Sequence, residues 1–232
     1  MSDIMIFKRY EKKYLLNKNQ YEQLMSVIRE KLIPDVYGKS TLCSLYLDTP
    51  DFLLIRNSID AIAYKEKLRL RSYGVPQKDK VVYFEIKKKY RGVVYKRRVS
   101  MTPEKVANYI ESGEMPFDSQ IMREIDYLMK FYHQPKPNVC ILCEREAFFD
   151  EKNADVRLTF DQNLRYRYGF PKTDNVNDGT PIVDDGQYIM EIKTPGAMPL
   201  WLANALSECK IYPKSFSKYA HAYFDILKKE EE

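Results

Sequence analysis

Basic side chains recur at alternate positions in several segments of this sequence. The longest run is Lys65, Lys67, Arg69 and Arg71. Residues i and i+2 of a strand face the same side, so this run would form a stripe of positive charge on one face. Arg offers a planar fork and Lys a compact charge to phosphate oxygens, so such a stripe can bind phosphate. The simpler alternative is a solvent-exposed sheet face.

The same alternation occurs elsewhere in combination with carboxylates. The shorter sets are Arg9, Glu11 and Lys13; Glu85, Lys87 and Lys89; and Lys96 and Arg98.

Charged residues also lie within strongly apolar segments, at 83–87, 139–149 and 188–193. Uncompensated burial of each charge would cost several kcal/mol. A closed barrel with a polar interior removes this conflict, because inward cations and acids meet one another, water or an anionic ligand. The sequence therefore predicts a barrel with helices packed outside.

The excess of inward cations suits a polyanion, such as a nucleoside triphosphate or an inorganic phosphate chain. The intermixed glutamates are wasteful in a simple anion-binding site. They are suitable ligands for Mg²⁺ or Mn²⁺, which take carboxylate and phosphate oxygens together.

The elements that must position these residues are mostly strands. Alternating and β-branched or aromatic segments, separated by turn residues, predict strands over 7–16, 41–48, 61–73, 80–89, 93–101, 138–150, 154–161, 164–168 and 187–194. Apolar residues at helical spacing predict helices after Asn17 or Asn19, from Pro103, after Ser119, over 199–209 and from Ser217. The segment 169–186 reads as a surface loop. This order predicts an α+β fold with an antiparallel sheet.

Composition limits the possibilities further. The 232 residues are 44% hydrophobic and 13% aromatic, enough for a sizeable core, and show no interdomain linker. We expect a single domain over 1–232. No apolar stretch reaches membrane-spanning length and the start resembles no signal peptide, so a cytoplasmic protein is expected. Cys43, Cys140, Cys143 and Cys209 form no disulfide framework, and Cys140 and Cys143 should point to opposite faces of a strand.

Several short motifs, taken in order, resemble a known family. They are Arg9-Tyr10-Glu11-Lys12-Lys13-Tyr14, Leu68-Arg69-Leu70-Arg71, Glu85-Ile86-Lys87, Val94-Tyr95-Lys96-Arg97-Arg98, Arg145-Glu146-Ala147-Phe148, Glu191-Ile192-Lys193 and Ser217-Lys218-Tyr219. Over nearly the whole chain they resemble the polyphosphate polymerase (VTC) domain of the triphosphate tunnel metalloenzyme superfamily. That resemblance implies an antiparallel β-barrel that forms a tunnel.

The resemblance also assigns roles to individual residues. It implies phosphate contacts in the reaction for Lys13, Arg69, Arg71, Lys87, Arg145, Lys193 and Lys218. It implies further substrate contacts for Arg9, Lys96, Arg98, Arg157 and Ser217, and a metal ligand in Glu191.

Two departures from the wider pattern matter. Arg9-x-Glu11-x-Lys13 replaces a strand with two glutamates, which points to the polymerase branch. Cys143 stands where family members usually carry Tyr, which removes a phosphate-binding hydroxyl.

The activity implied is transfer of the ATP γ-phosphate to a growing polyphosphate chain, with Mn²⁺ or Mg²⁺ as cofactor. A tunnel hydrolase of tripolyphosphate, a nucleoside triphosphate or a 5′-triphosphate RNA end is one alternative, and a non-catalytic polyphosphate sensor is another. The expected partners are ATP and polyphosphate, and no nucleic acid is expected because the basic stripes face inward. A membrane partner would not be encoded in this chain.

Overall fold

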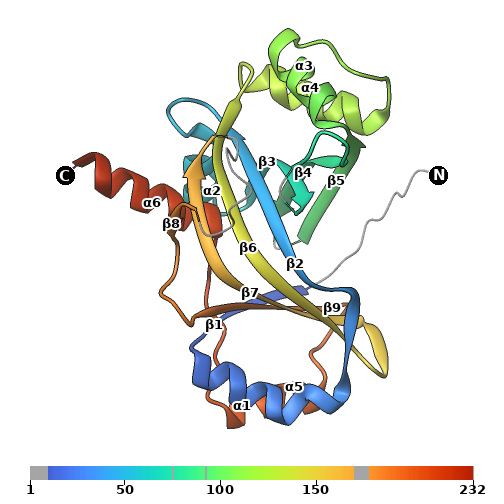
Figure 1. The fold of residues 1–232 in the computed structure, drawn as a ribbon, viewed down its shortest axis with the longest axis vertical. Coiled ribbons are helices and arrows are strands. Elements are labelled where there is room, and N and C mark those ends of the chain that lie inside the picture. The colour runs from blue at the N-terminus through green and yellow to red at the C-terminus, as the bar shows by residue number, and fades with distance from the viewer. Residues whose placement is uncertain (1–9, 75, 92, 170–177, 232) are drawn as a thin grey trace.

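The computed structural model describes residues 10–74, 76–91, 93–169 and 178–231. Its centre is one antiparallel sheet with strand order β1-β9-β7-β6-β2-β3-β4-β5, and a short β8 pairs with β7 (Figure 1). The strands are β1 (Tyr10–Leu16), β2 (Leu32–Asp48), β3 (Tyr64–Tyr73), β4 (Val82–Tyr90), β5 (Val93–Met101), β6 (Lys136–Asp150), β7 (Asn153–Tyr168), β8 (Thr180–Pro181) and β9 (Tyr188–Thr194).

The helices are α1 (Lys18–Ile28), α2 (Leu53–Asp60), α3 (Pro103–Ser112), α4 (Gln120–Phe131), α5 (Leu200–Glu208) and α6 (Lys218–Glu231), and a 3₁₀ turn follows α1 at Arg29–Lys31. Local chemistry explains several helix starts. Asn17 and Gln20 form a reciprocal capping box at α1. Thr102 caps α3 ahead of Pro103, and the Ser119 side chain accepts a backbone hydrogen bond at the start of α4.

The sheet has two halves joined by the long strands β2 and β6, which run between them in Figure 1. One half is β3, β4 and β5, and α3 and α4 pack on its outer face through a core that includes Leu68, Phe84 and Met122. The other half is β1, β9 and β7, which α1 and α5 cover through Leu24, Phe160 and Leu206. Each helix pair thus buries the apolar side of its strands and leaves the opposite side to the charged residues.

The predicted α+β fold with an antiparallel sheet is confirmed, but closure of the barrel is not. The helix pairs α1 and α5, and α3 and α4, pack outside as predicted, whereas α6 packs on the inner face through Tyr219 and Tyr223, against Tyr46 and Ile141. Within the described chain, β1 and β5 are the two ends of the hydrogen-bonded order and do not pair with each other. The sheet is therefore an open one in its backbone pairing.

Two strand predictions need correction. The strand predicted over 41–48 begins nine residues earlier, at Leu32, and its register against β6 shifts between Pro34 and Lys39. The strands predicted over 154–161 and 164–168 are one strand, β7, because the left-handed Asn163 (φ 51°) forms an irregularity within it.

Helix α2 was not predicted. It begins because both carboxylate oxygens of the buried Asp48 accept backbone hydrogen bonds, from Leu54 at 2.8 Å and Ile55 at 3.0 Å. The loop predicted over 169–186 lies partly outside the described residues and contains β8. No helix in the described part of the chain is long and apolar enough to cross a bilayer.

Candidate functional site

The inner side of the sheet carries a continuous set of ionised side chains, which we call the charged face. Strand register places them side by side: Arg69 lies opposite Glu85, which lies opposite Arg98, and Lys67 lies opposite Lys87, which lies opposite Lys96. In the other half, Glu11 faces Lys193 and Lys13 faces Glu191. The charged face consists of Glu11, Lys13, Lys67, Arg69, Arg71, Glu85, Lys87, Lys96, Arg98, Arg145, Asp161, Glu191 and Lys193, with Lys218 from α6.

Glu85 is the centre of the first ionic group. Its side chain is 0% exposed, and its carboxylate lies 2.7 Å from Arg69 Nε and 2.5 Å from Lys96 Nζ. Burial raises the pKa of Glu85, but Arg69 and Lys96 outweigh burial and lower it to about 2. Burial also lowers the pKa of Lys96 to about 8, against the opposing effect of Glu85. Glu85 therefore stays ionised and holds both cations in place.

Glu191 is the centre of the second group. Its carboxylate lies 2.8 Å from Lys193 Nζ and 3.8 Å from Lys13 Nζ, with the side chain 13% exposed. Burial works against ionisation, but Lys193 and Lys13 hold the pKa of Glu191 well below its usual range.

Glu11 connects this group to the opposite half of the sheet. One carboxylate oxygen of Glu11 lies 3.7 Å from Lys13 Nζ and 3.7 Å from Lys87 Nζ. Lys87 belongs to β4, which is not a neighbour of β1 in the sheet. The two halves therefore approach each other across the charged face, and side chains connect them where backbone hydrogen bonds do not.

The third group joins β6, β7 and α6. Arg145 donates two hydrogen bonds to Asp161, at 2.5 and 2.7 Å, and Lys218 Nζ pairs with the same carboxylate. Burial opposes the charge on Asp161, yet Lys218 and Arg145 lower its pKa. Cys143 lies beside this group, with its Sγ 3.5 Å from Lys218 Nζ, and burial raises its thiol pKa.

The start of α6 also meets the charged face. Lys67 Nζ donates to Ser217 Oγ at 3.0 Å, and Lys13 Nζ donates to the Phe216 carbonyl at 3.0 Å. Since the N-terminus of a helix carries partial positive charge, the start of α6 adds to the positive potential there.

Two cations on β3, Lys67 and Arg71, form no salt bridge within the described residues. Burial, together with the nearby charges of Lys13, Lys87 and Arg69, lowers the pKa of Lys67 to about 8 against the opposing effect of Tyr46. Arg71 donates from Nη2 to Ser44 Oγ at 3.3 Å, while its buried Nε has no hydrogen-bond partner in the described structure. A buried donor without an acceptor favours an anionic ligand at this position.

The other predicted site residues have mixed placements. Arg98 is on the charged face, with its guanidinium 4.7 Å from the ring centroid of Tyr83. Arg157 is already paired with Asp35 and lies 4.8 Å from the Phe149 ring centroid, so it is a weaker candidate for phosphate contact. Arg9 lies outside the described residues. Cys140 and Cys143 point to opposite faces as predicted, Cys140 into the α3 and α4 core and Cys143 toward Lys218.

Sequence reasoning missed Asp161 and Tyr46. Asp161 ends the strand predicted over 154–161, and the signal that assigns it to the inner face is its alternation with the buried Phe160 and Leu158. Burial raises the pKa of the Tyr46 phenol, but Arg69, Lys67 and Arg71 outweigh it and lower the value to about 8.

The residues present fit a divalent cation only in part. No group of three or more His, Cys, Asp or Glu side chains suited to a metal occurs in the part of the chain that the structure describes. Glu191 and Glu11 lie close enough to share Lys13 and supply carboxylate oxygens. With phosphate oxygens added, this donor set is the kind that Mg²⁺ and Mn²⁺ prefer.

A curved antiparallel sheet, helices on its outside and cations on its inside define the class of the triphosphate tunnel fold. Among solved structures, a putative adenylate cyclase from Bacillus halodurans matches with a TM-score of 0.56 at 15% identity, covering 90% of this chain and 95% of that one. A putative adenylyl cyclase from Hippeastrum, described as having a dominant triphosphatase activity, matches with a TM-score of 0.53 at 16% identity, covering 91% and 92%.

A third similar structure, a putative adenylate cyclase from Vibrio parahaemolyticus, has a TM-score of 0.52 at 11% identity and covers 94% of this chain and 99% of its own. At these identities the likeness concerns the fold alone. A comparison with curated proteins gave no match. The family model of the VTC domain matches residues 8–226, and the chain belongs to the VTC domain family.

Proposed function

We propose that this protein is a polyphosphate polymerase that transfers the γ-phosphate of ATP to a growing inorganic polyphosphate chain on the charged face. The observation that carries the proposal is the meeting of cations from β1, β3, β4, β5, β6, β9 and α6 around four carboxylates, those of Glu11, Glu85, Asp161 and Glu191. This arrangement leaves Arg71 with a buried unpaired donor. It suits a ligand with many negative charges in a row.

The reaction requires little covalent chemistry from the protein. A terminal oxygen of the polyphosphate chain, already anionic, attacks the γ-phosphorus of ATP. The bond from that phosphorus to the β–γ bridging oxygen breaks, and the electron pair leaves with ADP. No hydroxyl must be deprotonated, so positioning and neutralisation of charge supply the catalysis.

The roles follow the three ionic groups. Lys13, Lys87 and Lys193 would hold phosphates beside Glu191, and Arg69 and Arg71 would hold them along β3. Arg145, Lys218 and Ser217 would contact them at the start of α6, with Lys96 and Arg98 on the β5 side. Mn²⁺ or Mg²⁺, when bound at Glu191 and Glu11, would neutralise phosphate charge. ATP as substrate is consistent with the expected cytoplasmic location.

A triphosphate hydrolase is the second candidate, because the similar Hippeastrum protein is described as having a dominant triphosphatase activity. It would use the same cations with water as the acceptor. A non-catalytic sensor would bind polyphosphate without turnover.

Incubation with ATP and MnCl₂ separates these functions. The expected products are ADP and polyphosphate chains, visible on a polyacrylamide gel and degraded by an exopolyphosphatase. Orthophosphate without chains would identify a hydrolase, and polyphosphate binding without ADP formation a sensor. Lys193→Met should abolish chain formation. Arg123→Ala on α4, which removes an exposed cation paired with Asp118, is the control and should leave chain formation unchanged.

A further inference from the structure

Three tyrosines form a row at one end of the charged face. Tyr37 and Tyr73 are 74% and 47% exposed, and their rings lie 6.3 Å apart between centroids at an interplanar angle of 21°. Tyr73 in turn meets Tyr83 edge to face, with centroids 5.9 Å apart. Large aromatic rings in mutual contact at the surface are costly to leave in water, and they suggest a planar ligand.

The row continues directly from the phosphate-binding cations. Tyr73 follows Arg71 by two residues on the same strand face, a spacing of about 7 Å. Tyr83 is the cross-strand partner of Arg71, and Arg98 lies over the ring of Tyr83. A ligand whose phosphates contact Arg69 and Arg71 would therefore bring its next group onto these rings.

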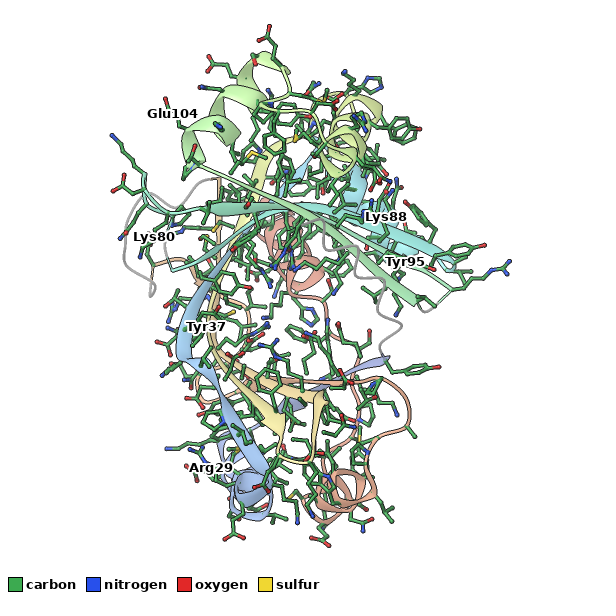
Figure 2. The ribbon with its side chains drawn as sticks, turned by 90° about the vertical axis from the view of Figure 1, so that its right-hand side faces the viewer. Arg29, Tyr37, Lys80, Lys88, Tyr95 and Glu104 are labelled. Atoms are coloured by element: carbon green, nitrogen blue, oxygen red, sulfur yellow. The ribbon has the colours of Figure 1, made fainter. Side chains whose placement is uncertain are left out.

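The position of Tyr37 is fixed by a backbone hydrogen bond to Asp35, which is itself held in a salt bridge. It lies where the pairing of β2 with β6 shifts register, and its backbone N–H donates to Asp35 Oδ1 at 3.3 Å. Asp35 pairs with Arg157 of β7. The next residue, Gly38, has φ +54°, a left-handed conformation that favours glycine. Figure 2 places Tyr37 on the same side of the molecule as Lys80, opposite Lys88 and Tyr95.

We infer that Tyr37, Tyr73 and Tyr83 bind the nucleobase of a nucleoside triphosphate by stacking, while its phosphates occupy the charged face. This inference rests on the proposed function and names the end of the face at which ATP enters. Tyrosine rings carry no positive charge, so they suit a base better than a further stretch of phosphate. Every nucleobase has a ring face to stack, so the site would accept ATP and GTP alike.

The test compares ligands that share phosphates and differ in the base. Binding of tripolyphosphate, and of ATP and GTP analogues with an imido β–γ bridge, is measured by calorimetry for wild type, Tyr37→Ala and Tyr73→Ala. Loss of one stacking ring should weaken binding of both nucleotide analogues about tenfold and leave tripolyphosphate within twofold. Tyr73→Phe keeps the ring and should bind as wild type does.

Tyr127→Ala is the matched control, since Tyr127 is 63% exposed and stacks on Phe131 of α4 at 6.0 Å and 22°, on the outside of the sheet. It should change no affinity. Equal losses for nucleotide and tripolyphosphate in Tyr37→Ala and Tyr73→Ala, or no loss for either, would overturn the base site while leaving phosphate binding intact. If wild type binds neither tripolyphosphate nor nucleotide, the proposed function itself fails.

Discussion

Glu85 and Glu191 both lie on the charged face beside two cations, but they differ in burial and in their distances to those cations. Glu85 in the β3, β4 and β5 half is fully buried and meets Arg69 and Lys96 at 2.7 and 2.5 Å. Glu191 in the β1, β9 and β7 half is 13% exposed, with one cation at 2.8 Å and another at 3.8 Å. Water can therefore replace partners at Glu191 and cannot do so at Glu85.

This difference separates a structural carboxylate from one that can change partners. If Glu85 lost its charge, Arg69 and Lys96 would be left without a counter-ion. Glu191 shares Lys13 with Glu11, so an incoming metal or phosphate can redistribute the same charges. A cation-rich face can therefore contain both fixed and exchangeable groups. The following substitutions test that division.

The largest effect is expected for Glu85→Gln. Removing this charge leaves Arg69 and Lys96 uncompensated, and the free energy of unfolding should fall by about 3–5 kcal/mol. Urea unfolding followed by circular dichroism measures the change. The control is Glu144→Gln, whose carboxylate pairs at 3.0 Å with the exposed Lys39 and which should cost less than about 1 kcal/mol. Equal losses in the two variants would show that the charge of Glu85 stabilises the fold no more than that of Glu144.

For Glu191→Gln, turnover should change much more than stability. If Glu191 holds the divalent cation, the amide keeps the shape and loses the anchoring charge, so formation of ADP from ATP should slow at least about 100-fold, or about 2.7 kcal/mol of barrier. Polyphosphate should still bind through the cations. Turnover rates at several Mn²⁺ concentrations and polyphosphate binding by calorimetry check both parts. Near-normal metal-dependent turnover would show that the metal is held elsewhere.

Arg71→Ala should weaken tripolyphosphate binding by about 1.5–3 kcal/mol, the size of a hydrogen bond to a charged group. Arg71 is a cleaner probe than Arg69, because Arg69 compensates the buried Glu85, whereas the Arg71 side chain makes a single hydrogen bond within the described residues, to Ser44. The melting temperature of the ligand-free variant should be unchanged or higher, since like charges are crowded there. Unchanged affinity would exclude Arg71 from the site.

The smallest effect concerns Lys67 and pH. Its pKa is lowered to about 8 in the folded protein and is about 10.4 when unfolded, so between these values the unfolded chain binds more protons. The free energy of unfolding gained from Lys67 therefore rises with pH across this window. Lys67→Met should be more stable than wild type at pH 7, and the advantage should shrink by pH 9.5.

The exposed Lys18→Met of α1 is the control for this pH effect, and its stability relative to wild type should not vary over that range. Thermal unfolding of the ligand-free proteins at pH 7, 8 and 9.5 makes the measurement. A Lys67→Met advantage that grows with pH would contradict the sign.

The sequence alone determined the alternation of charge on each strand. In β3, Leu68 and Leu70 are buried while Lys67, Arg69 and Arg71 remain partly open on the opposite side, as the period of two requires. The starts of the helices capped by Asn17, Thr102 and Ser119 were also predictable from the sequence, because each capping residue lies within one turn of the backbone group that it binds. Helix α2 could not be predicted in this way, since its start depends on hydrogen bonds from the Leu54 and Ile55 backbone to the Asp48 side chain in β2.

Which charges meet depends on contacts between residues far apart in the sequence. Arg157 pairs with Asp35, 122 residues away in sequence, and Lys218 with Asp161, 57 residues away. Alternation fixes the face on which a side chain lies. Its partner depends on strand order, register and the curvature that brings Lys87 to Glu11 across the sheet. Those quantities arise from the packing of the whole chain, so no local pattern distinguishes the locked Glu85 from the exchangeable Glu191.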